Sequence, residues 1–220
     1  MVRAARDIPE GEEITMTYFD NESGVQKRQK ASYSGWGFNC ECTLCEIETA
    51  ESQEVQDKRQ ELMEKASKFK IYLEQPVKKT NSGIAPMMAL IKGIEATYTK
   101  PEFIHPRVQL LPPTILQTFL VRAERPPDIS LFAKEMLNGL GFNIATKGGK
   151  VVIERYGYMC YPVMHLFVHV ITAGAMMGDL WTATLWRNAT AKVYEVLAGE
   201  KETFFDVFGR VILQARLPFD

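Results

Sequence analysis

Nine residues near the N-terminus, Gly37-Phe38-Asn39-Cys40-Glu41-Cys42-Thr43-Leu44-Cys45, contain three of the four cysteines of the chain. The spacing C-x-C-x-x-C lets three thiolates converge on one ion, and tetrahedral zinc is the usual occupant of such a ligand set. A disulfide framework would spread the cysteines along the chain, so this clustering indicates metal chemistry in a reducing compartment. A closed structural zinc site has four ligands and this segment supplies three, so the alternative is three reduced thiols at the surface.

The residues before the cysteines have the pattern of a β-hairpin, over residues 2–20. The stretch Pro9-Glu10-Gly11-Glu12 has the composition of a turn. After it, Ile14, Met16 and Tyr18 alternate with other residues at the period of a strand. Residues 27–34 predict a short helical turn that leads into the cysteine segment.

The hairpin and the cysteine segment together resemble the end of a SET domain and its post-SET motif. That family has an Arg-Asp-Ile strand, a Gly-Glu-Glu turn, a strand ending in Tyr, a basic segment and then Gly-Phe-x-Cys-x-Cys-x-x-Cys. Residues 5–18 and 37–45 carry these features in the same order. The resemblance covers residues 1–46, and the helical sequence beyond it is similar to the SET-and-MYND branch and its fungal relatives.

This resemblance implies a SET-type protein-lysine N-methyltransferase, which transfers a methyl group from S-adenosylmethionine to a lysine side chain. Tyr18 matches the catalytic tyrosine of the family, and Phe38 matches the aromatic residue that packs on the adenine of the cofactor. Trp36 stands where the branch often has a tyrosine, beside the cofactor, where its ring would form a wall of the lysine channel. Three residues match post-SET zinc ligands: Cys40, Cys42 and Cys45.

Other parts of the family pattern have no counterpart in these 220 residues. They are the first cofactor loop, the Asn-His-Ser-type segment, the fourth zinc cysteine and the MYND zinc finger. We therefore expect an incomplete chain that holds one wall of the active site and does not methylate by itself. The alternative is a non-catalytic helical protein-interaction module that carries a vestigial SET end.

Residues 47–220 form the second predicted domain, which is mainly helical. The predicted fold class is thus α+β, with a small β-rich SET remnant, a cysteine-rich post-SET segment and a tetratricopeptide-like helical domain. Helical periodicity and end signals predict helices over residues 55–73, 87–94, 113–125, from Asp128 or Ser130 to Gly139 or Gly141, 162–177, 180–197 and 203–214. Lys150–Arg155 fits either a strand or the start of a helix. The charges of residues 46–70 predict a solvated helix face.

The amino-acid composition of the chain limits the classes of molecule that we expect it to bind. The 26 Lys and Arg residues balance 27 Asp and Glu residues, which is not the basic footprint of a nucleic-acid-binding protein. Residues 159–186 are apolar but include Pro162, His165 and His169, so we expect two buried helices rather than a membrane span. The N-terminus lacks the apolar core of a signal peptide. The expected partner is a protein with a target lysine, histone or not, in the nucleus or the cytoplasm, with no nucleic acid or membrane bound directly.

Three further patterns have ordinary explanations. His165 and His169 have the i, i+4 spacing of metal ligands, but no third ligand is near them in the sequence, so we expect histidines of the core or of a groove. Gly148-Gly149-Lys150 resembles a fragment of a phosphate loop, but the first glycine and the Ser or Thr of that motif are missing, so we expect a turn. Cys160 lies in an apolar stretch and is expected to be a buried, inert thiol.

Overall fold

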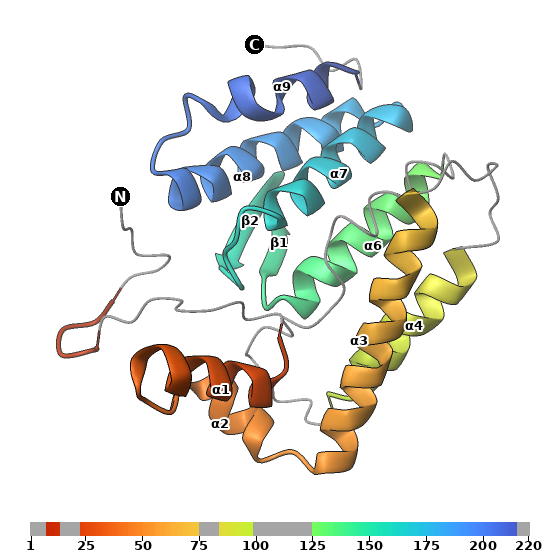
Figure 1. The fold of residues 1–220 in the computed structure, drawn as a ribbon. Helices are drawn as coiled ribbons and strands as arrows, with labels where there is room; N and C mark the ends of the chain where they lie inside the picture. The colour runs from red at the N-terminus through yellow and green to blue at the C-terminus, as the bar shows by residue number, and fades with distance from the viewer. Residues whose placement is uncertain (1–7, 14–22, 75–83, 99–124, 215–220) are drawn as a thin grey trace. The chain divides into compact units, whose positions relative to one another are not determined.

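The computed structural model describes residues 8–13, 23–74, 84–98 and 125–214, and the chain forms two compact units (Figure 1). One unit is Glu10–Leu111, and the other combines Met1–Pro9 with Pro112–Asp220. Most of the hairpin predicted for residues 2–20 and most of the helix predicted for residues 113–125 lie outside the described residues. The turn of that hairpin is described, and Gly11 in it has φ +84°. The domain boundary after residue 46 stays a prediction.

The described helices of the first unit are α1 (Val25–Trp36), α2 (Thr43–Thr49), α3 (Gln53–Glu74) and α4 (Ile84–Ala96). Helices α3 and α4 lie side by side (Figure 1). Met87, Ile91 and Ile94 recur at helical spacing on α4 and are buried, as the sequence predicts. Leu62 of α3 lies 3.4 Å from the position that a Cβ atom would have at Gly93, so the glycine lets the two helices approach closely.

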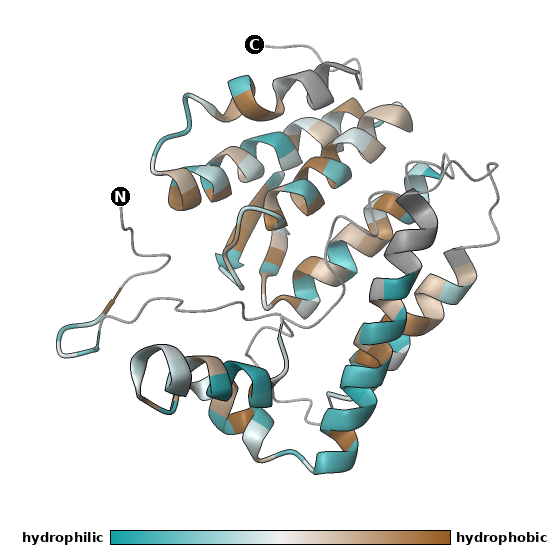
Figure 2. Ribbon diagram, viewed as in Figure 1, coloured by the Kyte–Doolittle hydropathy of each residue, from teal (hydrophilic) through white to brown (hydrophobic). Residues whose placement is uncertain are grey.

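The coloured part of α3 in Figure 2 is mostly hydrophilic, and over the residues whose burial is described the helix buries only a narrow face. Helix α1 is longer than the predicted helical turn at residues 27–34 and ends at Gly37. Gly37 has φ +75°, a conformation that favours glycine, and its N–H donates to the carbonyl of Tyr33 at 2.9 Å. This cap stops the helix and directs the chain into the cysteine segment.

The described elements of the second unit are α6 (Pro126–Gly139), β1 (Asn143–Lys147), β2 (Lys150–Arg155), α7 (Val163–Met176), α8 (Leu180–Ala198) and α9 (Phe204–Gln214). Strands β1 and β2 pair antiparallel, with Lys147 opposite Lys150. The two-residue turn between them, Gly148-Gly149, has φ of +53° and +70°, as a type I′ hairpin turn requires. The structure therefore decides the open alternative for Lys150–Arg155 in favour of a strand and confirms the predicted turn.

Helix α7 lies at the centre of this unit and packs against α6, α8 and α9. The break between α7 and α8 occurs as predicted, with φ +77° at Gly178 and with Asp179 accepting a hydrogen bond from the Thr182 N–H at 3.0 Å. Gly199 ends α8 in the left-handed conformation. The tetratricopeptide-like character is not confirmed, and strand β2 of the hairpin also contacts α8.

The predicted start of one helix in the second unit needs correction. Helix α6 begins at Pro126, not at Asp128 or Ser130, because proline fits the first helical turn, where its missing N–H has no partner to lose. Asp128 lies inside that first turn and pairs with Arg125. No helix in the described part of the chain has both the length and the apolar character needed to cross a membrane.

Candidate metal centre at the cysteine segment

Three cysteine sulfur atoms gather where α1 and α2 meet the segment between them. The Sγ atoms of Cys40, Cys42 and Cys45 all lie within 4.8 Å of one another. Zinc–sulfur bonds of about 2.3 Å in a tetrahedron place the sulfur atoms about 3.8 Å apart, so a small contraction would form a zinc site. Cys45 is completely buried, Cys40 is half-buried and Cys42 is exposed. These three residues therefore fit a metal ion that is approached from the side of Cys42.

A glutamine of α1 fixes the start of the cysteine segment. The side-chain amide of Gln29 donates to the Cys40 carbonyl at 2.7 Å, and its oxygen accepts from the Cys40 N–H at 2.8 Å. This pair of hydrogen bonds holds the Cys40 backbone against α1 in one orientation. Cys42 is the N-terminal cap residue of α2, and Cys45 lies in its first turn. The two helices thus set the backbone positions of all three thiols.

An arginine of α1 lies behind the buried cysteine. Arg28 is 1% exposed, and its Nη2 donates to Cys45 Sγ at 3.9 Å and also to a carboxylate oxygen of Glu48 on α2. Its Nη1 donates to the carbonyl of Ser23. Burial acts to lower the pKa of Arg28, but the Glu48 carboxylate outweighs burial and raises it. The guanidinium therefore stays charged next to the sulfur.

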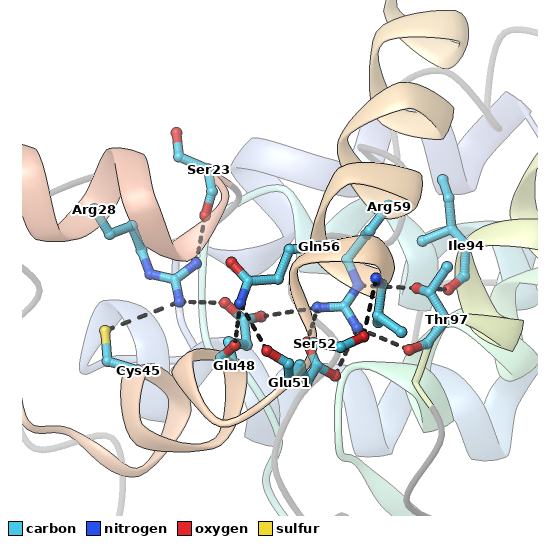
Figure 3. Close-up of polar contacts among 11 residues, drawn as sticks. Ser23, Arg28, Cys45, Glu48, Glu51, Ser52, Gln56, Arg59, Ile94 and Thr97 are labelled. Carbon is cyan, nitrogen blue, oxygen red and sulfur yellow. Dashed lines mark hydrogen bonds and ion pairs between the residues drawn. The ribbon is translucent and has the colours of Figure 1, made fainter.

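The polar contacts continue from Glu48 into α3 and the end of α4 (Figure 3). Glu48 is 3.8 Å from Nη1 of Arg59, which forms two hydrogen bonds to Glu51 at 2.7 and 2.8 Å. Arg59 also donates to the side chain and the carbonyl of Thr97, both at 2.9 Å. Its guanidinium lies 4.0 Å from the centre of the Tyr98 ring, a cation–π distance. We call Arg28, Glu48, Glu51 and Arg59 the buried ion network.

Two of the thiols, Cys42 and Cys45, differ in how readily they lose a proton. Burial raises the pKa of Cys45 to about 12, although Arg28 acts in the opposite direction. Burial also acts to raise the pKa of Cys42, but hydrogen bonds from Cys45 and Cys40 outweigh it and lower that pKa. Of these two thiols, Cys42 therefore loses its proton more readily, and coordination of a metal ion by Cys45 would require that thiol to lose its proton as well.

The residues predicted to contact cofactor and substrate lie beside this centre in the sequence. Trp36 is the last residue of α1 and is 53% exposed, so a large part of it faces solvent. Phe38 follows the Gly37 cap and is half-buried. Tyr18 lies outside the described residues, so its predicted position next to the cofactor stays a prediction.

The polar residues that support the cysteines are not predicted from the sequence. The prediction of a solvated face for the charges of residues 46–70 is wrong for Glu48 and Arg59, because they are 1% and 3% exposed. The signal for Arg59 is its place between Val55 and Leu62 on the same helical stripe, where a charged residue needs a buried partner. For Arg28 and Gln29, the amino-acid sequence alone gives no comparable indication that they support the cysteines.

The remaining candidate residues have structural roles. His169 is buried in the core of the second unit, and the ring of His165 contacts those of Tyr161 and Phe208, as expected for core histidines. Cys160 is half-buried rather than buried, and it precedes α7, accepting a hydrogen bond from the Val163 N–H through its carbonyl. The described part of the chain has one group of three or more metal-binding side chains, the cysteine cluster.

Comparison with known proteins finds relatives that are all named methyltransferases. The chain is 26% identical to a methyltransferase of Gibberella zeae, over 94% of this chain and 29% of that protein. It is 45% identical over 56 residues to histone-lysine N-methyltransferase SET5 of Yarrowia lipolytica, which is 26% of this chain and 13% of that protein. It is 34% identical over 64 residues to histone-lysine N-methyltransferase ASHR2 of Arabidopsis thaliana, or 29% of this chain and 16% of that protein.

A scan against profiles of protein families gave no match. The chain spans less than a third of the length of the curated relatives that it matches here. These relatives nevertheless carry methyltransferase names throughout, and they support a methyltransferase family for the chain. The chain is similar to SET-type lysine methyltransferases, in agreement with the resemblance carried by its hairpin and cysteine motifs.

Proposed function

We propose that this chain forms part of a SET-type protein-lysine N-methyltransferase. The observation that carries the proposal is the cysteine cluster, which follows Trp36 and Phe38 in the sequence. Helices α1 and α2 hold its three sulfur atoms close enough together to bind one metal ion. The order of these features is that of a post-SET segment. The methyltransferase names of the relatives support the same class.

The chain's own residues would act mainly by positioning. The bound cofactor, S-adenosylmethionine, supplies an electrophilic methyl group. Phe38 would pack on the adenine, and the exposed ring of Trp36 would line the channel for the aliphatic and cationic lysine side chain. The hydroxyl of Tyr18 would orient the neutral lysine amine along the axis of attack and face the partial positive charge on the methyl group.

Zinc would have a structural role in this enzyme. Cys40, Cys42 and Cys45 would hold it with a fourth ligand, and their chemistry suits zinc because thiolates are its preferred ligands. Because metal binding and folding are coupled, the ion would order the segment that carries Phe38. The metal would thus fix one wall of the active site without taking part in methyl transfer.

The substrate would be a protein with an accessible lysine. The relatives named histone-lysine N-methyltransferases favour a histone and therefore the nucleus. The balanced charge of the chain favours recognition of a protein tail over direct binding of DNA.

The test is methyl transfer by the intact enzyme, from labelled S-adenosylmethionine to a histone mixture. We expect transfer to lysine, and we expect Tyr18→Phe to reduce kcat by about 100-fold, because one positioned polar group is lost from the transition state. The affinity for S-adenosylmethionine should change little, since the cofactor contacts remain.

Tyr161→Phe is a matched control, because it removes an exposed tyrosine hydroxyl from the second unit, and it should leave kcat unchanged. Full activity of Tyr18→Phe would contradict the assigned role. Absence of transfer by the intact protein to any lysine-containing substrate would contradict the enzyme class and favour a protein-interaction module.

A further inference from the structure

We propose that Arg28 is a positioning residue of the metal centre, which holds the Cys45 sulfur and balances the charge of the metal–thiolate group. This inference rests on the zinc centre of the proposed function and adds a residue outside the cysteine motif. Arg28 would not touch the metal ion. It would act through Cys45, the one thiol of the three that has no access to water.

The geometry fixes the guanidinium in one place. Its contacts come from three sides: the Ser23 carbonyl before α1, the Glu48 carboxylate on α2 and the Cys45 sulfur. An arginine presents its donors in a rigid planar fork, so these contacts also fix the direction of the N–H that points at the sulfur. Figure 3 shows Arg28 between Cys45 and Glu48.

The charges explain why the sulfur needs this neighbour. A thiolate at a fully buried position loses the solvation that water would give it, and the N–H of a cation is the strongest available replacement. Two guanidinium groups face the one carboxylate of Glu48, that of Arg28 and that of Arg59, whose Nη1 is 3.8 Å away. Arg28 is therefore able to stabilise the Cys45 thiolate and Glu48 together.

A second residue of α1 also holds a cysteine of the cluster in place. Gln29, the next residue, holds the backbone of Cys40 through two hydrogen bonds. Adjacent residues of α1 thus fix the first and the last cysteine of the cluster. Hydrogen bonds of this kind orient metal ligands in other proteins, and their removal typically weakens metal binding by about 10- to 100-fold.

The competing explanation is that Arg28 only stabilises the fold through its ion pair with Glu48. A double variant separates the two roles. Arg28→Met with Glu48→Met removes both buried charges together, and such apolar replacement of a buried pair is tolerated by protein cores. The remaining pair, Arg59 with Glu51, stays balanced. The matched control, Arg59→Met with Glu51→Met, removes the other pair and leaves Arg28 beside Cys45.

The experiment measures zinc affinity by competition with a chromophoric chelator, and the absorption spectrum of the protein with cobalt in place of zinc. For the first double variant we expect zinc affinity about 10- to 100-fold weaker than that of the unsubstituted protein, with shifted sulfur-to-cobalt charge-transfer bands. The control should bind zinc within about 2-fold of the unsubstituted protein, with an unchanged spectrum, by the same reasoning. Circular dichroism should show unchanged helix content in both.

Unchanged zinc affinity and an unchanged cobalt spectrum in the first variant would overturn the inference. Equal losses of affinity in both variants would also overturn it, because the effect would then belong to the fold as a whole. The unsubstituted protein binding no zinc would overturn it together with the zinc centre. Methyl transfer is measured in a separate assay. Absence of methyl transfer would therefore not contradict a measured effect of Arg28 on zinc affinity.

Discussion

Gly157 lies where the chain leaves β2 and runs past residues 140–142. A Cβ atom placed there would be 2.2 Å from the Leu140 carbonyl oxygen and 2.6 Å from the Phe142 nitrogen. These are backbone atoms, and the N–H of Tyr158 already donates to that carbonyl at 2.8 Å, so neither side has room to move. The position therefore requires glycine for space rather than for backbone conformation.

We predict that Gly157→Ala lowers the free energy of unfolding by about 3 kcal/mol, because the methyl group forces the backbone of residues 140–142 away. Chemical denaturation followed by circular dichroism measures this. Gly209→Ala in α9 is the control. Its nearest described neighbour would be 3.8 Å away, so the substitution should be neutral or add up to about 1 kcal/mol. Equal stabilities of the two variants would contradict the packing described for Gly157.

Between whole elements, α7 and α8 of the second unit approach each other closely at a pair of small residues. A Cβ atom at Gly174 would lie 3.3 Å from the Cβ of Ala183, and Ala183 is completely buried. Small residues on both helices allow this approach, and the Gly178-Asp179 break between the helices keeps them antiparallel neighbours.

We predict that Ala183→Leu destabilises the protein by about 1 to 3 kcal/mol, because three extra carbon atoms must separate α7 from α8. Ala198→Leu, at the exposed end of α8, should change stability by less than about 0.5 kcal/mol. Urea denaturation of both variants measures the difference. If Ala183→Leu is as stable as the unsubstituted protein, the helices do not approach as closely as described.

Elements with strong local signals are the ones that the sequence predicts correctly. The α7–α8 pair has a continuous apolar period, a Gly-Asp break and a glycine cap, so both helices are predicted within one or two residues. The six residues Lys150–Arg155 fit the period of either a strand or a helix, and only their pairing with Asn143–Lys147 decides for the strand. The cysteine cluster follows from its spacing, but the support by Arg28 and Gln29 depends on how α1 packs, which spacing does not encode.

For the molecule as a whole, the two units have different interiors. The unit Glu10–Leu111 buries two arginines and two glutamates, all under 6% exposed, beside the cysteine cluster. The other unit buries mainly aliphatic and aromatic residues, and His169 is the buried histidine among its described residues. Acid should therefore act on the interior of this unit through His169.

His169 gives the second unit a specific acid sensitivity. Burial, with a smaller effect of His165, lowers the pKa of His169 from 6.5 to about 4. Between these values the unfolded chain binds a proton that the folded chain does not, so the free energy of unfolding falls as the pH falls from 6.5 to 4. The full loss is about 3 kcal/mol, since one pKa unit corresponds to 1.36 kcal/mol.

His169→Phe, which keeps a ring of similar size, should remove this part of the pH dependence. Urea denaturation at several pH values between 7 and 4 compares the two proteins, and the variant should gain about 3 kcal/mol relative to the original at the acid end. Effects of acid on other groups are common to both proteins and cancel. Parallel stability curves would contradict the assigned protonation state of His169.

The buried ion network has a consequence for how this part of the protein can be inherited. Arg28 precedes the cysteines in the chain, Glu48 and Arg59 follow them, and Thr97 lies beyond α4, yet all are joined by direct contacts. A gene rearrangement that copied α1 and the cysteine motif into another protein but stopped before Glu48 would leave the buried charge of Arg28 without its partner, at a cost of about 3 to 5 kcal/mol. The heritable unit is therefore the whole stretch from α1 to Thr97, and its four charged positions are expected to change across generations as pairs, Arg28 with Glu48 and Arg59 with Glu51.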